Sequence, residues 1–173
     1  GNNITNEEVI RSILLLDEGD PFNNLKLDQS IAKLKARDIF ASVKKVVKPG
    51  SEPELKIVDI TIEEKPTGEI SAGAGVGSDG GTVQVGVKEN NWLGTGVNLS
   101  SFIEVTDTSV KGNIEYQNPN FNNSGNSLNF NAGVVTNDQM SVSGYKSDTI
   151  SFGTSTDFEQ FKNVNNWYIR LKK

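Results

Sequence analysis

The chain has 173 residues, a formal net charge of -5, and neither cysteine nor histidine. Without these two residue types it has no disulfides, thiolate nucleophiles or imidazole bases, and it lacks nearly every ligand set that proteins use for zinc. The acidic balance argues against nucleic acid as a partner, because counterion release from phosphates requires clustered lysine and arginine.

The first predicted element is a helix that begins near Thr5. Thr5 and Glu8 have the spacing of a capping box. We expect this helix to end at Gly19, since glycine favours the C-terminus of a helix and Pro21 follows it. The apolar residues that recur at helical spacing between these limits are Val9, Ile10, Ile13, Leu14 and Leu16.

A second helix and two strands complete the first part of the chain. The helix is predicted over residues 24–37, where Leu27, Ile31 and Leu34 share one face. Two strand-like runs follow, with a turn at Pro49 and Gly50 between them, and they contain Phe40, Val43 and Val47 and then Leu55, Ile57, Val58, Ile60 and Ile62. This order predicts a small α+β domain whose two strands need a partner edge.

After Pro66 the sequence becomes rich in Gly, Asn, Ser and Thr, and it alternates between apolar and polar residues with a period of two. We expect six strands here, each with one apolar face, and either the start of a seventh strand or an irregular end between Trp167 and Leu171. The apolar members of the six segments are Ile70, Ala72, Ala74 and Val76; Val83, Val85 and Val87; Val97, Leu99, Ile103 and Val105; Val110, Ile114 and Tyr116; Leu128, Phe130, Ala132 and Val134; and Ile150 and Phe152.

Two kinds of sheet fit this alternation: a soluble sandwich with one face in a core, and a membrane barrel with its apolar face in lipid. The period alone does not choose between them. The high content of Gly, Asn and Ser on the polar face favours the barrel, because a water-filled lumen accommodates these residues. A second detail also favours it: aromatic residues that fit an interfacial girdle gather near alternate strand ends, at Trp92, Tyr116, Phe121, Phe158 and Phe161. No stretch reaches the roughly 18 consecutive apolar residues that a transmembrane helix requires.

The residues do not predict an enzyme. Aspartate and glutamate lie on the polar faces and in loops such as Thr106–Ser109, without a pairing that suggests acid and base roles. The glycine-rich run Gly73–Gly77 opens no predicted helix, so it offers no helix N-terminus to a phosphate. We therefore expect no catalytic residue, no cofactor and no metal.

Several motifs resemble those of BamA-type outer-membrane protein assembly factors. The segment N-N-W-L-G-T-G at Asn90–Gly96 is similar to the periplasmic turn after the second barrel strand in that family. K-P-T-G-E-I-S-A-G-A-G-V-G at Lys65–Gly77 resembles the passage into the barrel, and Y-Q-N-P-N-F at Tyr116–Phe121 resembles the segment after the fourth strand. L-D-Q-S-I-A-K-L-K-A-R-D-I-F at Leu27–Phe40 resembles the second helix of a polypeptide-transport-associated (POTRA) domain and its exit.

The resemblance implies two parts. Residues 1–66 would be the POTRA domain nearest the barrel, of βααββ order with its first strand missing. Residues 67–173 would be the first strands of an antiparallel transmembrane β-barrel, about six in number and an incomplete barrel by themselves. The family's later Arg-containing loop and its final strand with an aromatic end are absent from this chain.

For function, the resemblance implies a factor of the bacterial outer membrane, with its N-terminal domain in the periplasm. It would fold and insert client β-barrel proteins by pairing strands at a lateral seam, in contact with accessory assembly lipoproteins and the lipid bilayer. One alternative is a related POTRA-barrel pore that secretes or translocates polypeptides. A second alternative is a soluble β-sandwich binding module.

The resemblance also assigns residues to three places. The seam strand would consist of Glu69, Ile70, Ser71, Ala72, Gly73, Ala74, Gly75, Val76 and Gly77. Glycines weaken a strand interior and so ease its opening, although they would equally make room in the lumen or let the sheet bend.

Partner docking would involve Arg11 and Glu18, on one helix, although an exposed Glu before a glycine is also simply solvated. Trp92, Gly94 and Gly96 would form an interface turn, in which Trp92 anchors the chain at the membrane surface. The linker Glu63–Pro66 would set the angle between the two parts.

Overall fold

The computed structural model describes residues 2–77, 80–141, 143–159 and 168–172. The chain divides into two compact units, and the division is not contiguous in sequence. The first unit combines Gly1–Thr67 with the four residues Leu93–Gly96, and the second combines Gly68–Trp92 with Val97–Lys173. The two-domain boundary after residue 66 stays a prediction, but the grouping of Leu93–Gly96 with the N-terminal residues is a feature that the sequence did not indicate.

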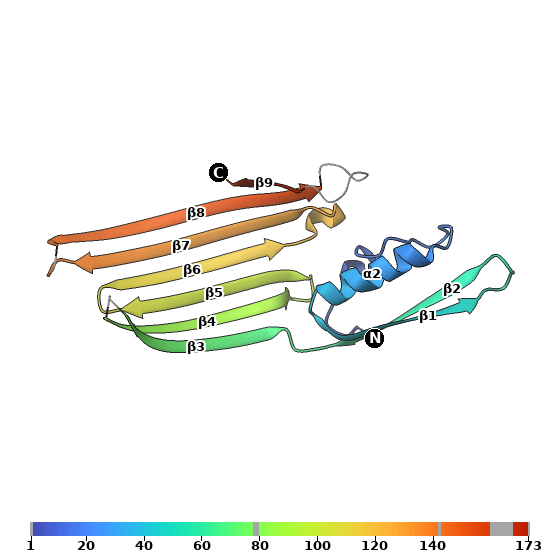
Figure 1. Ribbon diagram of the computed structural model, residues 1–173, viewed down its shortest axis with the longest axis horizontal. Helices are drawn as coiled ribbons and strands as arrows, with labels where there is room; N and C mark the ends of the chain where they lie inside the picture. The colour runs from blue at the N-terminus through green and yellow to red at the C-terminus, as the bar shows by residue number, and fades with distance from the viewer. Residues whose placement is uncertain (1, 78–79, 142, 160–167, 173) are drawn as a thin grey trace. The chain divides into compact units, whose positions relative to one another are not determined.

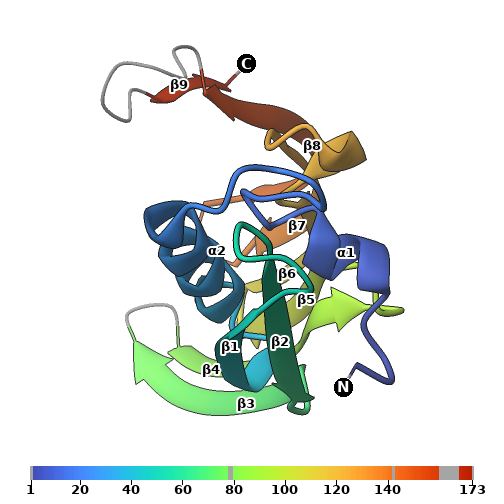
Figure 2. The same ribbon diagram turned by 90° about the vertical axis from the view of Figure 1, so that its right-hand side faces the viewer.

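The first unit contains two helices and an antiparallel pair of strands (Figure 1). Their order is α1 (Glu7–Arg11), α2 (Asn24–Ala36), β1 (Phe40–Pro49) and β2 (Lys56–Glu64). Helix α2 packs against β1 (Figure 2). The strands pair from Phe40 opposite Glu64 to Pro49 opposite Lys56, with an irregularity next to Phe40.

A single apolar core holds this unit together. Leu34 of α2 and Ile39, just before β1, are 0% and 1% exposed, so these two side chains are fully withdrawn from water. The buried residues of the core are Ile10, Ile31, Leu34, Ile39, Phe40, Val43 and Ile62, with Ile13, Leu14 and Ile60 packed partly against them. Burial of such side chains contributes roughly 1.5–3 kcal/mol each before chain entropy is subtracted.

The prediction for the first helix was wrong in its length and its cap. Helix α1 ends at Arg11, and its N-cap is Asn6, which makes no side-chain capping hydrogen bond. The chain leaves the helix because Leu15 donates its amide to Ser30 Oγ at 2.8 Å, an interaction with α2 that competes with helical pairing. Gly19 does adopt a positive φ of 94°, but it lies in a turn well beyond the helix.

Helix α2 runs over nearly the residues that the pattern predicted. Asn23 caps it by accepting a hydrogen bond from the amide of Lys26 at 3.1 Å, and Arg37 is its C-cap. Its three predicted apolar positions are all buried, together with Ser30. No helix among the described residues is both long and apolar enough to cross a membrane.

The second unit is one antiparallel sheet in which each strand pairs with its neighbours in sequence (Figure 1). The last strand, β9 (Tyr168–Lys172), lies where a seventh strand was one of two expectations. Phe161 of the predicted aromatic girdle and Trp167, where the possible seventh strand was expected to begin, lie outside the described residues. The strands are β3 (Gly68–Gly77), β4 (Gly80–Trp92), β5 (Val97–Thr106), β6 (Ser109–Asn118), β7 (Ser127–Gln139), β8 (Tyr145–Glu159) and β9 (Tyr168–Lys172).

One face of this sheet is apolar and open. The register places Ala72, Val85 and Ile103 in one cross-strand row, and the rows on either side of it continue the apolar face. Ile70 is 81% exposed and Phe152 is 82% exposed. From β3 to β8 the face carries no charged residue between the row of Glu89 and the row of Asp148. The described part of the unit is therefore a single sheet with an uncovered apolar face, and the two stacked sheets of the sandwich alternative are not what the structure shows.

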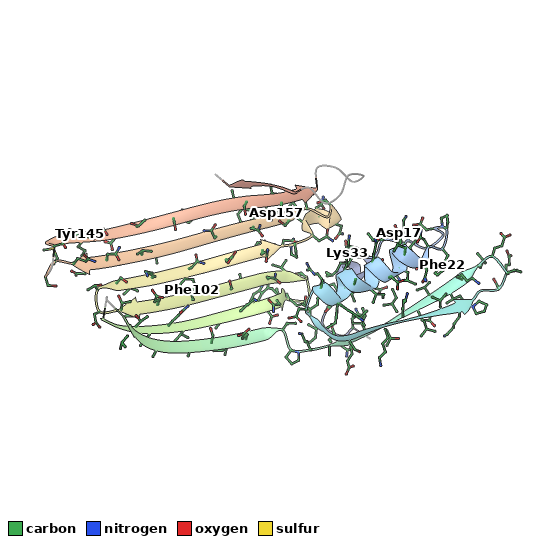
Figure 3. All side chains as sticks on the ribbon, in the orientation of Figure 1. Asp17, Phe22, Lys33, Phe102, Tyr145 and Asp157 are labelled. Atoms are coloured by element: carbon green, nitrogen blue, oxygen red, sulfur yellow. The ribbon has the colours of Figure 1, made fainter. Side chains whose placement is uncertain are left out.

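The opposite face is polar and is linked across the strands by side-chain hydrogen bonds. Asn98 Nδ2 donates to Gln117 Oε1 at 3.0 Å, and Ser127 Oγ donates to Asp157 Oδ2 at 3.0 Å. Phe102 is an apolar exception in the middle of β5, and Asp157 lies toward the far end of β8 (Figure 3). The alternation thus separates two environments along every strand.

Candidate strand-pairing edge and turn

The predicted seam residues all lie in β3, at the edge of the sheet. β3 pairs only with β4, from Gly68 opposite Glu89 to Gly77 opposite Gly80. Every residue of β3 is exposed. The backbone N–H and C=O groups on the far side of an edge strand are available for a further strand, which is how such edges template pairing. Among the described residues no strand occupies that side of β3.

The glycines of β3 differ from those inside the sheet. A Cβ added at Gly73, Gly75 or Gly77 would meet no atom within 4 Å. By contrast, a Cβ at Gly153 would lie 2.2 Å from Asn131 Oδ1, and one at Gly86 would lie 2.8 Å from Ser71 Oγ. Packing within the described chain therefore requires no glycine at positions 73, 75 and 77. The alternatives that these glycines make room in the lumen or let the sheet bend stay predictions.

The turn that follows β4 has an unusual backbone. Trp92 ends the strand and is 45% exposed. Leu93, Gly94 and Gly96 have positive φ values of 52°, 74° and 69°, and for a leucine this conformation is strained. The predicted role of Gly94 and Gly96 in turn geometry agrees with these angles. The register of β4 with β5 is also irregular between Glu89 and Trp92, and the pair Trp92–Val97 then closes the turn.

Residues of the N-terminal part hold this turn within the first unit. The amide of Asn6 donates to the carbonyl of Gly94 at 2.8 Å. Arg37 Nη2 donates to the carbonyl of Gly96 at 2.5 Å. Desolvation by burial lowers the pKa of Arg37, and its Nε has no hydrogen-bond partner in the described part of the chain. Sequence reasoning missed Arg37, because nothing in a single sequence links two residues 59 positions apart.

Glu64 is a second residue that the sequence did not single out. Its carboxylate accepts the amides of Asn3, Ile4 and Thr5 at 2.6, 3.0 and 2.7 Å. Desolvation would raise the pKa of this carboxyl, but hydrogen bonds from the Thr5 side chain and from these amides hold the pKa at about 2. The end of β2 thus fixes the segment that precedes α1.

The structure brings the two predicted docking residues together. Arg11 Nη1 lies 3.0 Å from Glu18 Oε1, and Arg11 Nε lies 2.7 Å from Glu7 Oε1. The hydrogen bond with Glu7 and then that with Glu18 raise the pKa of Arg11. Glu18 lies in the loop after α1 rather than on the same helix, which corrects the prediction. All three side chains are well exposed, and such surface pairs add little to stability, so they remain available to a partner.

Within the described residues no three side chains of His, Cys, Asp and Glu gather into a possible metal site. The features that could serve a function are therefore a strand edge that can pair through its backbone, an apolar sheet face, and a charged surface near α1. These three features define a class of protein in which a small α+β domain precedes an antiparallel sheet that exposes an apolar face.

Comparison with known proteins narrows this class. Residues 1–65 match the family model POTRA, described as "Surface antigen variable number repeat". The outer membrane protein assembly factor BamA of Neisseria meningitidis serogroup B (strain ATCC BAA-335 / MC58) is 27% identical over 173 residues, which cover 95% of this chain and 22% of the relative. A putative outer membrane protein assembly factor of Treponema pallidum (strain Nichols) is 34% identical over 107 residues, which cover 58% of this chain and 13% of the relative.

Solved structures agree in fold. The crystal structure of BamA from Haemophilus ducreyi lacking POTRA domains 1-3 superposes with a TM-score of 0.79 at 23% identity, covering 94% of this chain and 32% of that one. CdiB from Acinetobacter baumannii superposes with a TM-score of 0.55 at 19% identity, and the match covers 88% of this chain and 30% of that one. The chain is of the BamA type, with a POTRA domain at its N-terminus. It spans between 13% and 22% of the length of the curated relatives that it matches.

Proposed function

We propose that this chain serves in an outer-membrane protein assembly factor, which folds and inserts client β-barrel proteins by strand pairing at β3. The observation that carries the proposal is the pairing edge of β3, which lies in a sheet whose apolar face is left exposed by the described residues. The names of the two curated relatives, both assembly factors, support the same function. No covalent step is part of the proposal.

The apolar face supports a position in the bilayer of the bacterial outer membrane. Side chains such as Val85 and Ile103, 49% and 57% exposed, would be costly in water over so large an area, whereas lipid accepts them. β3, β5 and β6 have 10 residues each, close to the 9–11 residues of a strand that crosses a membrane. The sheet is then part of a transmembrane β-barrel, and the POTRA domain lies in the periplasm.

Client strands would add to β3 by backbone hydrogen bonds, since β-augmentation needs only a free edge. Gly73, Gly75 and Gly77 contribute because glycine gives an edge little side-chain packing to hold it closed. The exposed Arg11 and Glu18 would contact an accessory assembly lipoprotein. Trp92, at the end of β4, would anchor the turn at the membrane interface.

Single cysteines test the client site, because the chain has none of its own. Ala72→Cys lies in β3, and Ile103→Cys lies in the same cross-strand row on an inner strand that is paired on both sides. The variants are reconstituted in lipid with an unfolded client that carries one cysteine in its terminal strand. We expect disulfide crosslinks to the client from position 72 and none from position 103. Equal crosslinking at both positions, or none at position 72, would contradict the proposal.

A related POTRA-barrel pore that translocates polypeptides is the second candidate, and the fold similarity to CdiB favours it. Protease added outside sealed vesicles distinguishes insertion of a client from its translocation. An inserted client leaves protected membrane fragments, whereas a translocated client is protected over its whole length on the far side. The TM-score of 0.79 with a BamA structure, against 0.55 with CdiB, supports the assembly function as the first choice.

A further inference from the structure

The four residues Leu93–Gly96 separate β4 from β5 in the sequence, yet they belong to the compact unit of the POTRA domain. The pair Trp92–Val97 closes this four-residue loop, after an irregularity in the β4–β5 register between Glu89 and Trp92. Leu93 nevertheless holds a positive φ of 52°. A strained backbone of this kind persists only where the surroundings determine it.

The first attachment of this turn is the segment Asn3–Asn6. Glu64 binds its first three amides, and the fourth, on Asn6, donates to Gly94 at 2.8 Å. The approach is so close that a Cβ at Gly94 would lie 2.0 Å from the carbonyl oxygen of Ile4. Glycine is therefore required at position 94 by this contact as well as by its φ.

The second attachment is Arg37, at the C-terminus of α2. Its side chain is partly buried and its buried Nε is unpaired in the described part of the chain, which costs free energy unless another interaction compensates. Its bond to the Gly96 carbonyl is such an interaction, since hydrogen bonds from charged donors are stronger than neutral ones. A Cβ at Gly96 would lie 2.8 Å from Arg37 Nη2 and 2.8 Å from Val9 Cγ1.

We propose that Arg37 is a positioning residue that, with the Asn3–Asn6 segment held by Glu64, builds the Leu93–Gly96 turn into the POTRA domain. Residues of the POTRA domain then help to determine the conformation of the turn, beside the Trp92–Val97 pair that closes the hairpin. The inference does not depend on the assembly function. It gives the turn a second role beside the membrane anchoring proposed for Trp92.

Amide hydrogen exchange on the whole chain in lipid or micelles tests the role of Arg37. Arg37→Met keeps the aliphatic stem and removes the donors, and we expect about tenfold faster exchange in the turn and at Asn6, as the loss of a charge-assisted bond predicts. Arg37→Lys should restore much of the protection. Lys33→Met, on an exposed position of α2, removes the same charge and should change nothing (Figure 3).

Two results would overturn the proposal. One is unchanged exchange in the turn of Arg37→Met. The other is a uniform increase across α2 and β1, which would mean that Arg37 supports the domain in general. A second pair of variants guards against general unfolding: Gly94→Ala should release the turn and the amide of Asn6, whereas Gly125→Ala, with a similar φ of 78° and no neighbour within 4 Å, should not. Equal exchange at Asn6 in these two variants would also refute the proposal.

Discussion

Leu34 and Ile39 of the first unit are 0% and 1% exposed, whereas Ile70 and Phe152 of the second are 81% and 82% exposed. Both units use aliphatic and aromatic residues at regular spacing. In the POTRA domain these residues pack against each other from two helices and a hairpin. In the sheet they form one face that no other element within its unit covers.

The difference teaches that an apolar pattern identifies a buried surface but not what buries it. A protein core requires close packing, so each side chain there depends on its neighbours. A face that meets lipid requires only the absence of charge, and its neighbours are interchangeable. The two units should therefore respond to substitutions in opposite ways.

The largest effect is expected in the core. Leu34→Ala should destabilise the POTRA domain by about 3 kcal/mol, since it removes buried methyl groups and leaves a cavity. Phe152→Ala, which removes a larger but exposed side chain, should leave that domain unchanged. The unfolding of the first unit is measured separately by a urea titration that is monitored by limited proteolysis. A comparable loss in both variants would mean that the two apolar surfaces are not different in kind.

A charge on the apolar face should act next most strongly. Val85→Arg should weaken association with lipid vesicles by about 2–3 kcal/mol, the cost of arginine on the lipid side of a membrane strand. Gln84→Arg adds the same charge to the adjacent residue on the polar face and should be nearly neutral. Flotation with vesicles measures both. If both variants float equally well, lipid does not cover the apolar face.

The core and the sheet were not equally predictable from the sequence. Alternation with period two located the strands of the second unit, because each strand has one polar and one apolar face over its length. Helix α2 followed from its apolar spacing. Helix α1 did not, since Ile13 and Leu14 do pack partly against the core but in a non-helical segment tied to Ser30. The spacing of apolar residues indicates which side chains turn inward, whereas a tertiary hydrogen bond determines the conformation of the backbone.

The candidate sites divide in the same way. The seam role of β3 and the docking role of Arg11 and Glu18 were assigned by the resemblance to a family. Arg37 and Glu64 act through partners about 60 positions away, at Gly96 and at Asn3–Thr5. A hydrogen bond between an arginine and a distant carbonyl leaves no periodic signal, so a single sequence does not reveal it.

A smaller effect sharpens the comparison at the POTRA domain. The unfolded chain protonates Glu64 near its ordinary pKa of 4.5, whereas the folded domain does so at about 2. The unfolded state therefore binds more protons in this window, and the stability that Glu64 contributes is present above about pH 5 and lost as the pH falls toward 2. Glu64→Gln should cost roughly 1–2 kcal/mol at neutral pH and flatten this dependence.

Glu54→Gln is the matched control for charge, because Glu54 is exposed in the turn between β1 and β2. Its stability should follow that of the original chain from pH 7 to pH 3, as measured by urea unfolding of the first unit. A parallel pH profile in Glu64→Gln and the original chain would show that the carboxylate does not hold the N-terminal segment.

The smallest expected effect lies within the sheet. Gly75→Ala should be neutral or stabilise folding by about 0.5 kcal/mol, since it meets no atom and removes the entropy of glycine. Gly153→Ala should lose that gain, because its Cβ displaces the side chain of Asn131. Amide exchange in β3 and β8 compares them. A stable Gly75→Ala protein that no longer crosslinks to clients would link the glycine to pairing at the edge.

The first unit combines two separate stretches of the chain, and this matters for producing the POTRA domain by itself. A fragment that stops at Thr67 has the POTRA sequence but lacks the Leu93–Gly96 turn. The donors on Asn6 and Arg37 would then lose their carbonyl acceptors, and Val9 would lose its neighbour at Gly96. Grafting the tetrapeptide back through a short linker is therefore the way to produce this domain alone in its native form.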